Sequence, residues 1–207
     1  MKQIQLGEKV MVSDPCYGLN TWCQGVLENV LPGDYRCNIE YSDEGDWGMR
    51  VSAIEVVHKD YERPEEFQAE LFEVGVDSGQ AGIFDYDYYV QYHTNNKDWP
   101  HVDDDWYGKV CRLTYEKITN PNYEAFNWDV PNESNADKMK RYEEHTHSDK
   151  YWPYIERLTG NTIDNLGLVS SSGFGDGGYD CWTSKNEDGK IIAIRVEFIP
   201  VYDEEEE

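Results

Sequence analysis

Asp34–Tyr41 reads DYRCNIEY, and every second residue of this stretch is apolar or aromatic. Successive side chains of a β-strand point to opposite faces, so a strand here carries Tyr35, Cys37, Ile39 and Tyr41 on one face. We predict that this face packs against the core of a β protein.

The residues around this stretch extend the pattern. After Gly45-Asp46, the run WGMRVSAIEVVHKDY is rich in β-branched and aromatic residues and predicts a second long strand that pairs back on the first. Ala81–Val90 fits either a strand or one turn of helix, because periodicity cannot distinguish them over so few residues. Further strands are predicted at Lys9–Ser13, Gln68–Val76, Leu166–Ser170, Tyr179–Thr183 and Lys190–Tyr202, the last two joined by the turn SKNEDG.

The composition changes between residues 117 and 161, where Asn and Pro cluster before a run of helix formers, ADKMKRYEEHTHSDKYWPYIERL. Ser134 is the expected N-cap of this helix, Pro153 should end or kink it, and Gly160 is the expected stop. The predicted fold is mainly β: a single antiparallel β-sandwich-like domain over residues 1–202 with a helical insertion at about 117–161. Residues 203–207 form an acidic tail.

The strongly negative net charge disfavours nucleic acids and anionic membranes as binding partners. The chain has 207 residues with 18 basic and 42 acidic side chains, a net charge of -24, which repels nucleic-acid phosphates and anionic membranes. It lacks an apolar run long enough to span a membrane and a signal-peptide pattern at its start. Five cysteines without a CxxC pair argue against a disulfide framework and a zinc knuckle. We expect a cytoplasmic protein that binds neither membranes nor nucleic acid directly.

Three loop-like stretches draw attention as a candidate site: SDPCY (13–17), VDSGQAGIFD (76–85) and GFGDGGYDCW (173–182). Each places an Asp among turn-forming residues next to a predicted strand, where scaffolds present functional side chains. The candidate ligand-binding residues are Asp14, Cys16, Tyr17, Asp77, Ser78, Gln80, Asp176, Asp180 and Trp182.

If the three loops converge, Asp14, Asp77 and Asp176 form a cluster of hard oxygen ligands suited to Mg²⁺ or Ca²⁺, with Ser78 and Gln80 as neutral ligands. The competing interpretation is that each Asp caps its own turn by accepting backbone N–H groups. Known phosphate-loop and EF-hand patterns do not fit the glycine-rich stretch.

Catalysis by cysteine is a weaker possibility. Cys16 follows a proline in a predicted turn and is the best nucleophile candidate, with His58 or His101 as the base. The serines at 170–172 lack the GxSxG elbow of serine hydrolases. An enzyme is therefore less favoured than a binding protein.

The ordered combination of DPCY, GVDSGQAGIFD and GFGDGGYDCW followed by GKIIAIRVEF resembles a group of uncharacterised bacterial and bacteriophage proteins. The resemblance implies a β-rich, cytosolic, phage-encoded protein. It carries over no activity and no catalytic residue.

Three functions remain open. The first is a binding module that recognises a host protein or small ligand through its Asp/Gly-rich loops, helped by the aromatic residues Trp22, Trp47, Trp106 and Trp182. The second is an acidic nucleic-acid mimic that inhibits a host DNA-binding protein, since residues 60–105 hold thirteen acidic and two basic side chains, a net of -11. The third is a divalent-metal-dependent hydrolase. We favour them in that order.

Overall fold

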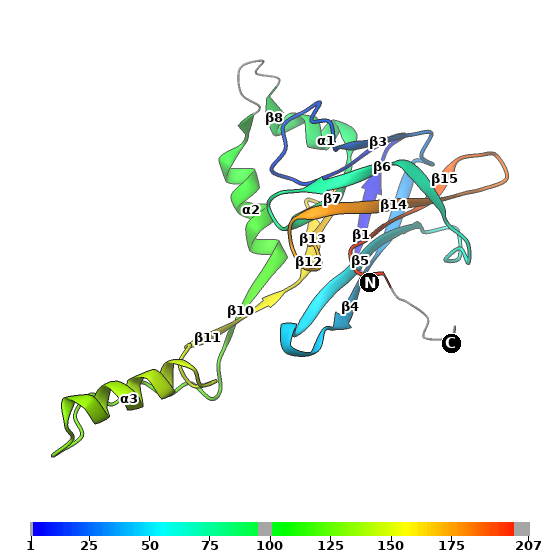
Figure 1. The fold of residues 1–207 in the computed structure, drawn as a ribbon. Coiled ribbons are helices and arrows are strands. Elements are labelled where there is room, and N and C mark those ends of the chain that lie inside the picture. The colour runs from blue at the N-terminus through cyan, green and yellow to red at the C-terminus, as the bar shows by residue number, and fades with distance from the viewer. Residues whose placement is uncertain (1, 95–100, 201–207) are drawn as a thin grey trace. The chain divides into compact units, whose positions relative to one another are not determined.

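The computed structural model describes residues 2–94 and 101–200. The chain divides into two compact units, one made of residues 1–115 and 158–207 and the other of residues 116–157. The first unit contains two antiparallel β-sheets, which Figure 1 shows as the larger part of the ribbon. The prediction of a mainly antiparallel β fold with a helical part is confirmed.

The larger sheet has six strands and includes the pair that the sequence predicted. Tyr35 lies opposite His58 and Ile39 opposite Ile54 in an antiparallel ladder. The C-terminal strands complete the sheet on the far side of this pair. In spatial order the strands are β1 (Gln3–Leu6), β4 (Gly33–Asp43), β5 (Met49–His58), β15 (Ile191–Glu197), β14 (Gly177–Lys185) and β6 (Gln68–Val76), with a 3-10 turn, η1 (Gly45–Trp47), between β4 and β5.

The second sheet has five strands, three of which are almost continuously buried along their length. Such strands are covered on both faces, whereas a strand with one solvent face alternates. In spatial order they are β12 (Gly160–Ile163), β13 (Gly167–Ser171), β7 (Gln80–Asp85), β2 (Lys9–Ser13) and β3 (Gly25–Glu28).

The two sheets enclose the main core. Strands of both sheets contribute to it, with Val12 and Ile83 from the five-stranded sheet and Tyr35, Ile54 and Ile194 from the six-stranded sheet, each completely or almost completely buried. Tyr35 satisfies its polar end by donating its hydroxyl to the Leu31 carbonyl oxygen at 2.7 Å. Tyr35 of the Asp34–Tyr41 face is therefore part of the core between the sheets, and Cys37 and Ile39 pack against that core.

Two helices cover the other face of the five-stranded sheet. Their aromatic side chains form a second core with Met11 and Phe84 of the sheet, and Trp106 is its largest member. The helices are α1 (Tyr86–Gln91) and α2 (Asp104–Thr114), and a short ribbon of β8 (His93–Thr94) and β9 (His101–Val102) precedes α2. Each helix begins with an aspartate cap: Asp85 accepts the N–H of Tyr88, and Asp103 accepts that of Trp106.

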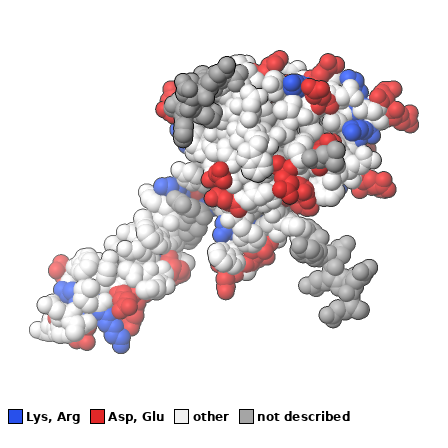
Figure 2. Space-filling model, turned by 45° about the horizontal axis from the view of Figure 1, so that its top comes forward, with Lys and Arg blue, Asp and Glu red and all other residues white. Residues whose placement is uncertain are grey.

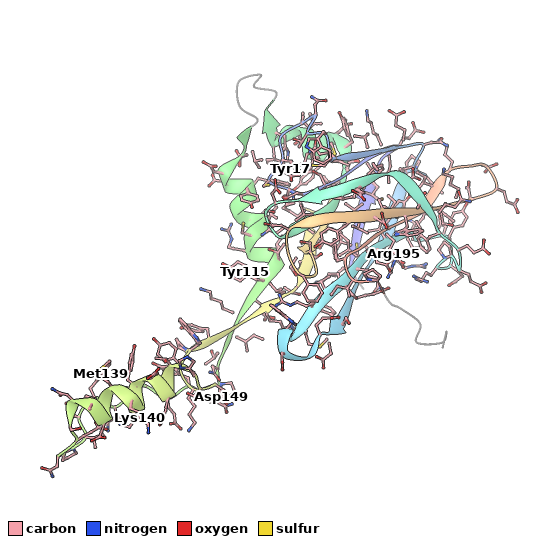
Figure 3. All side chains as sticks on the ribbon, viewed as in Figure 1. Tyr17, Tyr115, Met139, Lys140, Asp149 and Arg195 are labelled. Atoms are coloured by element: carbon pink, nitrogen blue, oxygen red, sulfur yellow. The ribbon has the colours of Figure 1, made fainter. Side chains whose placement is uncertain are left out.

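The second unit, residues 116–157, contains the helix α3 (Asn135–Thr146). Ser134 caps this helix as predicted, accepting the N–H of Asp137. A ribbon of β10 (Tyr115–Thr119) and β11 (Tyr154–Leu158) joins the two units. The side chains of α3 are exposed or half-buried, including Met139 and Lys140, which Figure 3 labels.

Several sequence expectations differ from the structure. The helix in the insertion ends at Thr146, before Pro153 and Gly160. Tyr41 is 39% exposed, because the β4–β5 register shifts between Glu40 and Tyr41 and a bulge reverses the alternation of side chains. The last strand ends at Glu197, and the predicted acidic tail at 203–207 lies outside the described residues. Ala81–Val90 is a strand followed by a helix.

On the visible surface, acidic side chains outnumber basic ones. Figure 2 shows Asp and Glu scattered over this face with fewer Lys and Arg, as a net charge of -24 requires. No helix among the described residues is long and apolar enough to cross a membrane.

Candidate functional site

Asp14 joins two of the three predicted loops. It follows β2 directly, its side chain is completely buried, and each of its carboxylate oxygens accepts two hydrogen bonds. Oδ1 accepts from the Cys16 N–H at 2.8 Å and the Ser78 hydroxyl at 2.7 Å, and Oδ2 accepts from the N–H groups of Asp77 and Ser78, both at 2.8 Å. Asp14 therefore ties the loop between β2 and β3 to the turn between β6 and β7.

The loop between β2 and β3 is also held from within. The hydroxyl of Tyr89, on α1, donates to the Tyr17 carbonyl oxygen at 2.8 Å. Gln24 reaches back through its side-chain amide to the Ser13 hydroxyl at 3.0 Å. Because Tyr89 is completely buried, this loop rests on the second core rather than lying free on the surface.

The third loop meets the other two at a pocket of about 550 Å³. All three predicted stretches reach it: Tyr17, which Figure 3 labels, comes from the first, Asp77 from the second and Asp176 from the third. Further lining residues are Thr21, Trp22 and Cys23 of the β2–β3 loop, Glu73, Gly75 and Val76 of β6, and Gly177 and Gly178 of β14. The loops named by the sequence thus share one cavity, with Asp14 buried behind its wall.

Three carboxylates and two aromatic rings line this pocket. Glu73, Asp77 and Asp176 are exposed, and Trp22 is 92% exposed. Partial burial raises the pKa of the Tyr17 hydroxyl, and its hydrogen bond to the Asp77 carboxylate raises this pKa further. Tyr17 is therefore a neutral donor that orients Asp77.

The glycines at this pocket allow close approach. A Cβ atom at Gly75 would lie 2.7 Å from both the Cβ and the Sγ of Cys23, and one at Gly178 would lie 3.2 Å from Glu73 Oε2. Side chains at these positions would push the β2–β3 loop and Glu73 away. Part of the glycine-rich stretch therefore provides room for Glu73 beside β14.

A row of like charges runs from the pocket across the outer face of the six-stranded sheet. Glu73 on β6 lies opposite Asp180 on β14, and Asp180 lies opposite Glu197 on β15. Directly opposed like charges destabilise an antiparallel sheet. Asp180 thus belongs to an acidic row that begins at the pocket.

Trp182 occupies the neighbouring row, opposite Arg195 of β15, which Figure 3 labels. Its indole Nε1 is buried and has no hydrogen-bond partner within the part of the chain that the structure describes. Arg195 binds Glu40 through two hydrogen bonds of 2.8 Å and contacts the buried carboxylate of Glu55 at 3.4 Å. This ion network covers the sheet next to the acidic row.

Ser78 and Gln80 lie elsewhere, at a smaller pocket of about 240 Å³ that Arg50 also lines. The Gln80 amide donates to the Thr114 hydroxyl at 2.9 Å, and its Oε1 atom is buried without a partner. These two predicted ligands therefore face a different cavity from Asp77 and Asp176. Among the described residues, no group of three or more His, Cys, Asp or Glu could hold a metal ion.

Cys16 is not an activated nucleophile. Burial raises the pKa of its thiol, and the neighbouring Asp14 carboxylate raises it further, so the reactive thiolate is scarce.

Neither histidine predicted as its base is shown beside Cys16. His58 lies at the end of β5 beside Tyr35 and Tyr61, and the side chain of His101 lies outside the described residues. The histidine closest to this loop is His93, whose Nε2 is 3.3 Å from the Pro15 carbonyl oxygen. Burial lowers the pKa of His93, and this effect outweighs the carbonyl oxygens of Tyr89 and Pro15, which raise it.

Sequence analysis missed Glu73 and Gly178 as members of the site. The signal for Glu73 was present, because alternation in Gln68–Val76 places residues 73 and 75 opposite the buried Val74 and Val76. Trp22 was noted only as one aromatic residue among several, and nothing local predicts that its ring stays exposed.

The chain was compared with known proteins in three ways. Residues 6–196 match the family model described as "Protein of unknown function (DUF4241)". The searches of curated proteins and of solved structures found no match. The match spans nearly the whole chain, and the protein belongs to the DUF4241 family.

Proposed function

We propose that this protein is a binding module that recognises a positively charged group, an ammonium or a guanidinium, in the pocket between its three Asp/Gly-rich loops. The observation that carries the proposal is the lining of one 550 Å³ cavity by Glu73, Asp77 and Asp176 beside the exposed ring of Trp22. Ligand pockets commonly measure about 300–1,000 Å³.

The charges at this pocket are available to a ligand. No ion pair between described residues involves Glu73, Asp77 or Asp176, whereas Arg195 and Arg63 already neutralise Glu55. Opposite charges attract more strongly where protein walls lower the local dielectric. The exposed indole of Trp22 adds a face for a cation–π contact, which is strongest with Trp.

The acidic row on the sheet also favours a positively charged ligand. Glu73 and Asp180 repel each other across adjacent strands, and Arg195 partly neutralises Glu197 at the other end of the row through a contact of 3.4 Å. A bound cation at the Glu73 end relieves part of the repulsion. A sheet that only needed to be stable would gain from neutral residues there. The cost in stability is consistent with a site kept for binding.

Binding is tested by isothermal titration with the peptide acetyl-Gly-Arg-Gly-amide and its citrulline analogue, which has the same shape without the charge. We expect the arginine peptide to bind at least about tenfold more tightly, a difference of about 1.4 kcal/mol. Free L-arginine is the third ligand and separates a small-molecule site from a peptide site. Equal affinity for the arginine and citrulline peptides would overturn the proposal.

Two variants separate the pocket from the general acidity of the surface. Asp176→Asn removes one charge at the pocket, and Asp188→Asn removes one charge in the exposed turn beyond the other end of β14. Only Asp176→Asn should weaken the arginine peptide. If both variants weaken it equally, the binding reflects net charge and the pocket is not the site.

The nucleic-acid mimic is the second candidate, favoured by the same row of carboxylates. Adjacent strands lie about 4.8 Å apart, whereas duplex DNA carries one charge per about 1.7 Å of axis. One row is too sparse by itself, and Arg195 neutralises part of the neighbouring face. If the protein displaces labelled duplex DNA from a nonspecific DNA-binding protein, and does so equally well with Asp176→Asn, the mimic is favoured over the pocket.

A further inference from the structure

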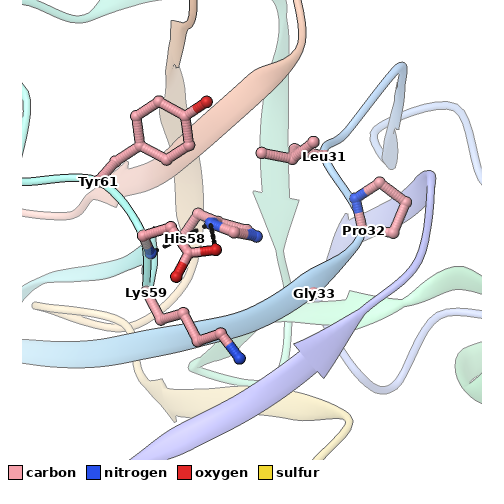
Figure 4. Close-up of a pocket in the computed structure, with 7 residues that line it drawn as sticks. Leu31, Pro32, Gly33, His58, Lys59 and Tyr61 are labelled. Carbon is pink, nitrogen blue, oxygen red and sulfur yellow. Dashed lines mark hydrogen bonds and ion pairs between the residues drawn. The ribbon is translucent and has the colours of Figure 1, made fainter.

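A third pocket lies where β4 begins and β5 ends. It measures about 600 Å³ and shares no lining residue with the acidic pocket. Leu31, Pro32 and Gly33 form one side, and residues 58–61 form the other (Figure 4). Apolar groups of Leu31 and Pro32 therefore face the ring of Tyr61 across the cavity.

His58 presents a polar atom to this pocket. Its side chain is 6% exposed, and Nδ1 accepts the backbone N–H of Asp60 at 3.3 Å. Because a backbone N–H can only donate, this contact assigns the lone pair to Nδ1 and the ring proton to Nε2, although the Asp60 carboxylate also lies 4.0 Å from Nδ1. Nε2–H has no hydrogen-bond partner among the described residues, and Figure 4 shows this side of the ring directed toward Pro32 and Gly33.

Gly33 is necessary for this arrangement. A Cβ atom at position 33 would lie 2.5 Å from His58 Nε2, and the backbone there has a φ of 152°. Any other residue would displace the imidazole or block its donor. Glycine at position 33 therefore keeps free the space into which the Nε2–H can donate a hydrogen bond.

The wall formed by residues 58–61 is fixed in place. The Arg36 guanidinium donates to the carbonyl oxygens of Lys59 and Tyr61. The Asn186 side-chain amide donates to the Tyr61 hydroxyl at 3.0 Å. The Lys59 ammonium is occupied by an ion pair with Asp34 at 2.7 Å. The pocket is therefore formed before any ligand arrives, which lowers the entropic cost of binding.

We propose that this pocket binds an uncharged ligand through a carbonyl-type oxygen that accepts the His58 Nε2–H, with the apolar body of the ligand between Leu31, Pro32 and Tyr61. An N–H group that has no partner among the described protein residues gains a hydrogen bond when a ligand supplies an acceptor. An anion is disfavoured by the net charge of -24 and by the prior pairing of Lys59. A cation would be drawn to the Asp60 carboxylate beside Nδ1 and could not accept the hydrogen of Nε2.

The test uses three probes that share one ring: cyclopentanone, cyclopentanecarboxylate and cyclopentylamine. Titration is followed by the nitrogen resonances of the histidine rings and by backbone amide shifts. We expect cyclopentanone to move the His58 Nε2–H resonance and the amides of residues 31–33 and 58–61, with the charged probes at least tenfold weaker. Tighter binding of the carboxylate, or no shift with cyclopentanone, would overturn the assignment.

Two variants complete the test. His58→Phe keeps a ring of similar size and removes the donor, so cyclopentanone should lose at least tenfold in affinity. Lys59→Gln removes the nearby charge and should leave cyclopentanone binding unchanged. A loss of cyclopentanone affinity in this variant would show that Lys59 binds the ligand and would contradict the proposal. If His58→Phe fails to fold, the wild-type spectrum decides, because a ring protonated on Nδ1 instead of Nε2 would contradict it directly.

Discussion

Asp14 and Ser78 are joined by two hydrogen bonds that bridge 64 residues of sequence: the Ser78 hydroxyl donates to Oδ1 and its backbone N–H to Oδ2. Cys16 and Asp77 supply the remaining two donors. The loop that leaves β2 and the turn that leaves β6 are therefore positioned by one buried carboxylate. The acidic pocket is built on this junction.

Asp14→Asn should destabilise the fold. The substitution replaces one acceptor oxygen with an NH₂ group that faces two donors, and leaving buried donors unpaired costs about 2–3 kcal/mol. Urea unfolding would measure the loss as a lower midpoint with an unchanged slope. Asp77→Asn is the control, because its side chain is exposed and its backbone N–H is retained, so it should change stability by less than about 0.5 kcal/mol.

Divalent metals should leave the melting temperature unchanged at millimolar concentration. Both oxygens of Asp14 are already occupied by four donors, and Asp14 does not line the pocket that Asp77 and Asp176 share. A metal that bound the folded state would raise the melting temperature by mass action. A rise with Mg²⁺ or Ca²⁺ that Asp176→Asn abolishes would restore the metal-site hypothesis.

Local patterns predicted most of the sheet framework. Alternation over Asp34–Tyr41 identified the face that carries Tyr35 into the core, and Gln68–Val76 was predicted with the bounds that the structure has. The helix α2 was missed although a local signal was present: Trp106 and Val110 stand at the i, i+4 spacing of one helix face in DDWYGKVCRLT, and Asp103 caps the helix. Which surface that face packs against, the five-stranded sheet, is a tertiary contact that the local pattern does not give.

The candidate site was predictable in part for a similar reason. Turn chemistry and strand ends indicated loops that reach one pocket, and Tyr17, Asp77 and Asp176 do line it. The role of Asp14 depends on donors from Asp77 and Ser78, and a contact over such a distance in sequence leaves no local signal. Ser78 and Gln80 face another cavity because Ser78 turns its hydroxyl inward to Asp14.

Stability should fall as the pH rises above about 8.5, the ordinary pKa of a thiol. Burial raises the pKa of Cys37 to about 12 and raises that of the fully buried Cys181 as well. Folded thiols keep their protons at a pH where unfolded thiols lose them, so the unfolded state binds fewer protons and gains stability. The free energy of unfolding should decrease by up to about 1.4 kcal/mol per pH unit for Cys181, and by less for half-buried Cys37.

Urea midpoints between pH 7 and pH 10 measure this slope. Cys181→Ala removes one titrating group and should flatten the slope, whatever its effect on stability at pH 7. An equally steep slope in this variant would contradict the assignment of the effect to Cys181.

Arg195→Met should destabilise the protein by about 3 kcal/mol. It leaves the buried carboxylate of Glu55 with Arg63 alone, and an incompletely compensated buried charge is costly. The hydrogen bonds from Arg195 also lower the pKa of Glu40. That contribution is present above the unfolded carboxyl pKa of about 4.3 and is lost as the pH falls below it, so wild type and variant should converge in acid.

Urea unfolding at pH 7 and pH 3.5 would measure both effects. Arg63→Met is the comparison, because its side chain is 52% exposed and water can replace part of its contact with Glu55. Its loss should be the smaller of the two. If Arg63→Met loses more stability than Arg195→Met, then Arg63, in the loop between β5 and β6, stabilises the Glu55 carboxylate more than Arg195 does.

Asp180→Asn separates a structural from a functional role for the acidic row. Asp180 lies directly between Glu73 and Glu197, and Arg195 already pairs with Glu197 at 3.4 Å. Neutralising Asp180 therefore removes one full like-charge contact, with Glu73, and a weaker one with Glu197, worth up to about 1 kcal/mol together. We therefore expect the variant to be more stable than the wild type by roughly 0.5 kcal/mol, since its side chain is exposed and salt screens the repulsion. The arginine peptide should bind this variant more weakly, because Asp180 extends the negative field around Glu73. Measured together, a gain in stability with a loss of binding marks residues kept for recognition, whereas a loss of stability would show that Asp180 serves the sheet itself.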